Sequence, residues 1–191
     1  MGALILKQLM AAKENNELVA IRSGDKGSGR YSVGYILMCT DVVVSIKAIN
    51  PKGLVDGIFT IKTDDIFGLD MDDKYINRLQ DKMEFADQIY EPVEVPVFFS
   101  NEETDVKAFL EMAKDEEQLI HISLYKKIGM FGYVQDVSDE EFQLMVYNDA
   151  GEYDGVSVYY IDDIKNISWD DEDIRLVEVL IQRSNLIGGV N

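Results

Sequence analysis

Two stretches of this chain, 34–79 and 132–177, read GYILMCTDVVVSIKAINPKGLVDGIFTIKTDDIFGLDMDDKYINRL and GYVQDVSDEEFQLMVYNDAGEYDGVSVYYIDDIKNISWDDEDIRLV. Aligned without a gap at an offset of 98 residues, they are identical at 13 of 46 positions. Unrelated stretches of this composition would share about three or four positions. The alignment therefore predicts a duplicated structural unit, with two copies of one fold in tandem.

The residues shared by the two copies are mostly turn formers. Asn, Pro, Asp and Gly supply the preset or positive φ angles that a chain reversal needs. Between these turns lie segments of five to ten residues rich in Val, Ile, Tyr and Phe, which is the pattern of a β-meander. Gly34 and Gly132 interrupt such segments. A glycine there predicts a sharp strand bend, as a small closed barrel requires.

Helices are predicted at both ends of each copy. One-sided apolar spacing predicts helices over 3–15 and 104–115, ahead of the first strand. Aspartate pairs at 72–73 and 170–171 precede a short apolar helical pattern, and acidic residues suit a helix N-terminus because the N–H groups there lack partners. The expected fold class is mainly β (α+β), with two tandem five-stranded barrels that each have an N-terminal helix and a short C-terminal helix.

The repeat divides the sequence into four parts. Copy one, with its C-terminal helix, covers 1–90, and copy two covers 102–186. Between them, 91–101 is a strand-like connector whose prolines limit it to a sheet edge or a strap. Residues 187–191 are expected to form a frayed tail.

A glycine in a bent strand, followed seven residues later by an aspartate and then by a further strand, occurs once in each copy. The pairs are Gly34 with Asp41 and Gly132 with Asp139. A strand, a tight turn and a short last strand follow at 58–69 and 156–167. In both motifs each copy resembles the Sm-like (LSm) family. Small SH3-like and PRC-type barrels share much of this pattern.

The Sm-like resemblance implies a site for RNA. In that family the contacts come from a polar residue shortly after the motif aspartate and from a basic turn in the second motif. In copy one these positions are Ser45 and Lys62, and a glycine-rich loop nearby is basic. The candidate RNA-binding residues are therefore Arg22, Lys26, Arg30, Ser45 and Lys62. RNA binding through copy one is the alternative function.

The charge distribution argues against nucleic acid as the main partner. The chain has a net charge of −18. Residues 1–90 carry 11 Lys/Arg and 13 Asp/Glu, whereas residues 91–191 carry 7 and 23. A nucleic-acid binder needs local cations to displace counterions from phosphate. The sequence thus disfavours RNA and predicts no DNA partner.

Catalytic and metal-binding residue types are scarce. The chain has one histidine, His121, and one cysteine, Cys39, both within strand-like segments where packing roles are more common than catalysis. Zinc ligands are too few, and the acidic runs at 70–73 and 170–173 lack the spacing of a calcium loop. We expect no enzyme activity, metal or cofactor. A single cysteine and the lack of a long apolar segment predict a cytoplasmic protein without a membrane partner.

Self-association is the function that the repeated scaffold predicts. The Sm-like resemblance implies that units associate through the edges of their last strands, and an exposed strand edge is a template for such pairing. The candidate edge residues are Ile58, Thr60, Val156, Val158 and Tyr160. Three chains with two positions each would close a pseudo-hexameric ring of a non-enzymatic assembly or regulatory module. The alternative is a monomer whose two copies pair with each other.

Overall fold

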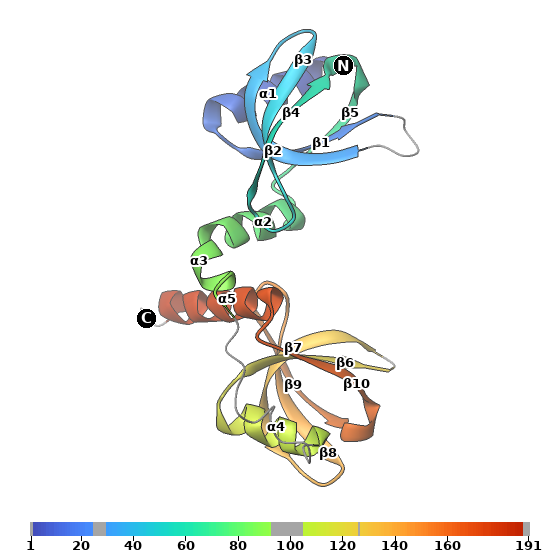
Figure 1. Ribbon diagram of the computed structural model, residues 1–191, viewed down its shortest axis with the longest axis vertical. Coiled ribbons are helices and arrows are strands. Elements are labelled where there is room, and N and C mark those ends of the chain that lie inside the picture. Colours follow the sequence, from blue (N-terminus) through green and yellow to red (C-terminus); the bar gives the residue numbers. More distant parts are fainter. Residues whose placement is uncertain (1, 25–29, 93–104, 126, 189–191) are drawn as a thin grey trace. The chain divides into compact units, whose positions relative to one another are not determined.

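The computed structural model describes residues 2–24, 30–92, 105–125 and 127–188. In these residues the protein is a mixed α+β structure, mostly strand, with two five-stranded antiparallel sheets and their helices (Figure 1). The chain divides into two compact units, Met1–Ala86 and Asp87–Asn191. The predicted fold class and the tandem repeat are confirmed.

The first unit begins with a helix and continues as a meander. Its elements are α1 (Ala3–Asn15), β1 (Leu18–Ser23), β2 (Arg30–Cys39), β3 (Val43–Ile49), β4 (Val55–Lys62), the 3-10 helix η1 (Thr63–Asp65), β5 (Ile66–Met71) and α2 (Lys74–Glu84). The short helix α3 (Ala86–Ile89) follows. Helix α1 has the predicted bounds.

The second unit repeats this order. Its elements are α4 (Val106–Asp115), β6 (Leu119–Leu124), β7 (Lys127–Val137), β8 (Glu141–Tyr147), β9 (Tyr153–Tyr160), η3 (Ile161–Asp163), β10 (Ile164–Trp169) and α5 (Glu172–Gly188). Helix α5 has 17 residues and is not the short helix that we expected. Its buried residues Ile174, Val177 and Ile181 continue the helical spacing beyond the aligned stretch. The connector from 93 to 101 and the tail from 189 lie outside the described residues.

Both sheets are curled. The strand order is β4-β3-β2-β1-β5 in the first unit and, read from the other edge, β10-β6-β7-β8-β9 in the second. Strands β4 and β5 thus lie at opposite edges, which in a flat five-stranded sheet would be about 19 Å apart. Only the three residues of η1 join them, and four Cα steps span at most about 15 Å. The sheet must therefore curl until its edges approach.

The bend that permits this curl occurs at the two predicted glycines. A Cβ atom on Gly34 would lie 3.0 Å from the carbonyl carbon of Lys47 and closer still to its oxygen. A Cβ atom on Gly132 would lie 2.5 Å from Cγ of Leu144 and 2.7 Å from the oxygen of Met145. A register shift follows within a few residues in both ladders. At both glycines the neighbouring strand thus lies too close for a side chain, and the register shift that follows fits the expected bend or bulge in these strands.

The same polar side chains hold the same turns in both units. Oγ of Thr40 and of Ser138 accepts the N–H group three residues later, at 3.0 and 2.9 Å. Oδ1 of Asn50 and of Asn148 accepts two N–H groups of the next turn. Local hydrogen bonds of this kind specify a turn whatever its surroundings. They explain why the repeat is strongest at its turns.

Each unit has apolar clusters on both faces of its sheet. Inside the curl of the first unit, Leu9 of α1 packs with Val19 of β1, and both are fully buried. On the other face, Leu18 packs with Ile76 and Leu79 of α2. Consecutive strand residues point to opposite faces, so one strand serves both clusters. The second unit has the corresponding pair of clusters, with α4 on one and α5 on the other.

Candidate functional site

Strands β4 and β9 form one edge of each sheet and expose apolar side chains. Ile58 of β4 is 74% exposed, and Val156, Val158 and Tyr160 of β9 are 52%, 56% and 55% exposed. These side chains point outward because the alternate residues, such as Tyr159, pack against the core. The structure thus places the candidate edge residues on true sheet edges.

The outward face of the edge strand differs between the two units. In β9 it consists of Val156, Val158 and Tyr160, which we call the β9 stripe. Thr60 and Lys62 of β4 stand where the β9 stripe has Val158 and Tyr160. The β9 stripe is therefore the more apolar of the two edges.

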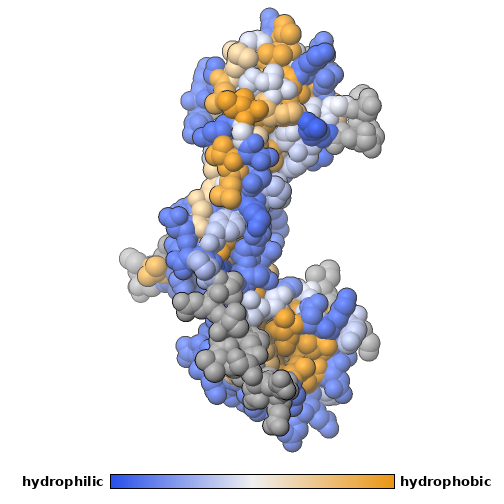
Figure 2. Space-filling model, viewed as in Figure 1, coloured by the Kyte–Doolittle hydropathy of each residue, from blue (hydrophilic) through white to orange (hydrophobic). Residues whose placement is uncertain are grey.

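The β9 stripe lacks the features that usually protect an edge strand. Lysine, proline or a bulge commonly blocks pairing with another chain. From 156 to 160 the sequence is VSVYY, and the β8–β9 register is regular over these residues. In the space-filling view, apolar side chains gather on the visible face of each unit (Figure 2). A partner strand could pair along 156–160 without burying a charge, because Asp154 and the register shift of β9 lie before this run.

The described RNA-binding candidates do not form one surface. Nε and Nη2 of Arg22 lie 2.8 and 2.7 Å from Oδ2 of Asp70, and the guanidinium group lies 5.1 Å from the centre of the Tyr31 ring. The guanidinium group of Arg30 lies 4.9 Å from the ring centre of Phe59. Arg22 pairs across the hairpin with Tyr31, the neighbour of Arg30. Alternation therefore directs the two arginines to opposite faces.

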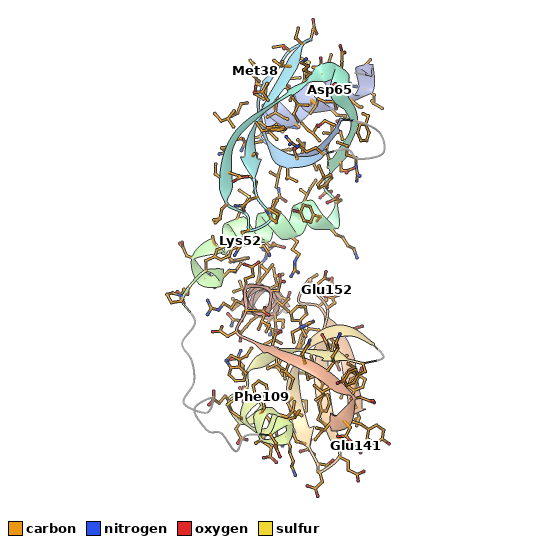
Figure 3. All side chains as sticks on the ribbon, turned by 45° about the vertical axis from the view of Figure 1, so that its right-hand side comes forward. Met38, Lys52, Asp65, Phe109, Glu141 and Glu152 are labelled. Atoms are coloured by element: carbon orange, nitrogen blue, oxygen red, sulfur yellow. The ribbon has the colours of Figure 1, made fainter. Side chains whose placement is uncertain are left out.

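Two further candidates, Ser45 and Lys62, occupy different surroundings. Ser45 is buried, and its hydroxyl lies 2.9 Å from that of Thr60. Lys62 is exposed at the end of β4, directly before a turn that contains Asp65. Figure 3 shows Asp65 at one end of the first unit and Lys52 at the opposite end. Lys26 lies outside the described residues.

In the described part of the chain, the residue types that commonly bind metal ions do not cluster. Within the described residues, no group of three or more His, Cys, Asp or Glu side chains is placed to hold a metal ion. The ring of His121 lies 4.7 Å from that of Phe131 and packs against it.

No helix in the described part of the chain combines the length and apolarity needed to cross a membrane.

A groove of about 560 Å³ in the second unit was not predicted from the sequence. Tyr133, Met145 and Tyr147 of the sheet line it together with Glu117 and the last turns of α5. The rings of Tyr133 and Tyr147 meet edge to face with centres 5.8 Å apart, and the Tyr153 ring lies 6.0 Å from that of Tyr147. We call this feature the tyrosine groove. The one difference in sequence that indicates the tyrosine groove is Tyr147, which stands where the first unit has Ile49.

The tyrosine groove changes the acidity of the Tyr133 phenol. Burial raises the pKa of Tyr133 to about 12, and the carboxylate of Glu178 and the neighbouring Tyr147 add to the effect. A pKa that is higher in the folded state means that folding favours the neutral phenol. This contribution to stability is complete below the unfolded pKa of about 10 and is lost as the pH rises toward 12.

Replacing Tyr133 with phenylalanine is expected to remove one late-ionising phenol. Titration at alkaline pH, followed by tyrosinate absorbance, should show one tyrosine with a pKa of about 12 in the wild type and none in the variant. The control is Tyr125→Phe, which removes an exposed phenol. Loss of the late phase in the control, or its persistence in Tyr133→Phe, would contradict the assignment.

No family model, curated protein or solved structure matches this chain. The class of protein must therefore be argued from its fold, its sheet edges and its charges.

Proposed function

We propose that this protein is a non-enzymatic assembly module whose two Sm-like units pair with neighbouring chains through their sheet edges. The observation that carries the proposal is the β9 stripe, an apolar and unprotected run on an edge strand. Ile58 marks the corresponding edge of the first unit. Apolar side chains that are more than half exposed on a free strand favour strand addition.

Several features of each unit support the Sm-like assignment. The first strand pairs with both the second and the fifth strand, and a glycine bends the second strand. A helix precedes the meander, and its apolar face packs into the curled sheet. Of these features, the bent-strand glycine is part of the two sequence motifs that resemble the family.

Charge favours contacts between unlike units of neighbouring chains. The first unit, Met1–Ala86, has 11 Lys/Arg and 12 Asp/Glu, whereas the second, Asp87–Asn191, has 7 and 24. Two second units would repel each other, but a second unit meets little repulsion from a first unit. Contacts of this head-to-tail kind close into rings when the rotation permits. Three chains would supply the six positions of such a ring.

We do not extend the proposal to RNA. Arg22 is already paired with Asp70, and the Ser45 hydroxyl is buried against Thr60. Salt-dependent binding of single-stranded RNA would favour the alternative if it were lost on joint replacement of Arg22, Lys26 and Arg30 by alanine.

A lysine in the β9 stripe is expected to disrupt assembly. In Val158→Lys, strand pairing would bring an unpaired ammonium group into an apolar contact, which costs several kcal/mol. We expect the apparent dissociation constant to rise by about tenfold or more. Light scattering coupled to size-exclusion chromatography measures the change, with a wild-type mass above the 21.7 kDa of one chain.

The matched control is Val158→Thr, because threonine is the residue at the equivalent position of the first unit. It keeps the β-branched shape and adds no charge, so most of the assembly should remain. A wild-type protein that stays monomeric at high concentration would refute the proposal. Equal masses for wild type and Val158→Lys would show that β9 is not the contact.

A further inference from the structure

Tyr35 and Tyr133 are equivalent residues of the two units, but different groups face their rings. In the first unit Lys47 is the cross-strand partner of Tyr35, and its Nζ lies 5.3 Å from the ring centre. An ammonium group at this distance is attracted by the negative face of the ring. In the first unit, the face of the Tyr35 ring is therefore already covered by a lysine of the same unit, Lys47.

The second unit has no such internal cation among its described residues. Met145 stands at the position of Lys47 and is the cross-strand partner of Tyr133. Among the described residues, the cations that lie over aromatic rings are Arg22, Arg30 and Lys47, all in the first unit. Lys114 borders the tyrosine groove, but its Nζ lies 2.9 Å from Oδ1 of Asp136, which neutralises it.

The second unit also gains negative charge at this place. Glu178 of α5 stands where the first unit has Gln80. Its carboxylate raises the pKa of Tyr133, but Glu178 lines the neighbouring groove beside Asp170 and not the tyrosine groove itself. Glu117, a further exposed carboxylate, lines the tyrosine groove. Compared with the first unit, the second unit thus lacks the lysine at the tyrosine ring and has an additional carboxylate, that of Glu178.

We propose that the tyrosine groove binds a lysine side chain presented by a segment of a partner protein. The rings of Tyr133 and Tyr147 contact its methylene groups and ammonium group, and the carboxylate of Glu117, which lines the groove, balances its charge, with Glu178 adding negative charge from beside the groove. The first unit provides the precedent, because a lysine already lies on the equivalent ring. The 24 Asp/Glu against 7 Lys/Arg of the second unit attract a basic partner. This proposal is independent of assembly through β9.

The test is an NMR titration of the full chain with a short, capped Gly/Ser peptide that contains one central lysine. A second peptide has norleucine in place of that lysine, and n-butylammonium chloride is the third probe. We expect the lysine peptide to bind about three to thirty times more tightly than the norleucine peptide, with the difference shrinking as salt is added. Equal affinity of the two peptides would overturn the proposal. If n-butylammonium bound as tightly as the lysine peptide, the ligand would be a small amine and not a segment of a partner protein.

Variants that exchange the two units' residues make the test specific. Met145→Lys recreates the arrangement of the first unit, so its own ammonium group should compete and lower the affinity for the lysine peptide by about tenfold. Met145→Gln, which adds no charge, should stay within about twofold of the wild type.

The reciprocal double variant Lys47→Met with Gln80→Glu should create a second binding site in the first unit and raise the stoichiometry from one to two. Glu178→Gln keeps the comparison possible if Met145→Lys fails to fold, and it should weaken binding about threefold. Unchanged affinity in both Met145→Lys and Glu178→Gln would refute the tyrosine groove as the site.

Discussion

A Gly34→Ala variant is expected to unfold with a free energy about 3 kcal/mol below that of the wild type. The new methyl group would overlap the main chain of Lys47 on the neighbouring strand, and main-chain atoms in a paired strand cannot move aside cheaply. The strand would have to lose its bend, and the curl of the first sheet depends on that bend. Urea denaturation followed by circular dichroism measures the change.

Two further glycine variants serve as comparisons. Gly132→Ala should cost a similar amount, because its Cβ atom would lie 2.7 Å from the main-chain oxygen of Met145 and 2.5 Å from Cγ of the fully buried Leu144. Gly2→Ala should be within about 0.5 kcal/mol of the wild type, since a Cβ atom there has no neighbour within 4 Å. A Gly34→Ala protein as stable as Gly2→Ala would contradict the close approach at the bend.

Phe142→Ala is expected to lower the free energy of unfolding by about 4 kcal/mol. Phe142 is 1% exposed and is the largest fully buried side chain of the described residues. Its ring centre lies 5.9 Å from that of Tyr159. Truncation loses the burial of the ring and leaves a cavity inside the curled sheet. The same denaturation experiment measures this loss.

The equivalent residue of the first unit offers a graded control. Val44 is fully buried at the position of Phe142, and Val44→Ala removes fewer atoms, so it should cost about 2 kcal/mol. Tyr125→Ala, at an exposed position, should change stability by about 0.5 kcal/mol at most. If Phe142→Ala lowered the free energy of unfolding by no more than Val44→Ala, the result would contradict the role of the Phe142 ring in filling the core.

Much of the fold could be predicted because it is specified locally. The turn side chains Asn50 and Asn148 bond to their own turns, and Asp73 and Asp171 cap the helices that follow them. Such contacts are encoded within a few residues and are repeated in both copies. The length of α5 was missed because the gapless alignment ends at 177, although at the same offset α5 corresponds to the range of α2 and α3 together.

The candidate site depended on contacts that are distant in sequence. Nothing near Arg22 in the chain indicates that Asp70, 48 residues away, neutralises it. Ser45 is polar, and its burial follows only from the assembled sheet. The tyrosine groove combines strand residues with the end of α5. The edge position of β4 likewise depends on a distant contact, because the fifth strand pairs with β1 and leaves β4 uncovered.

The pairing of the first strand with the last has a kinetic consequence. Ile21 pairs with Ser32, 11 residues away, but it also pairs with Leu69, 48 residues away. Closing the longer loop costs about 1 kcal/mol more in chain entropy. Hairpins form on shorter timescales than such distant pairings, so addition of β5 is the slow, completing step of the first unit's folding. Until that step is complete, β1 and not β5 is the open edge opposite β4, so a nascent chain displays a different pairing edge from the finished protein.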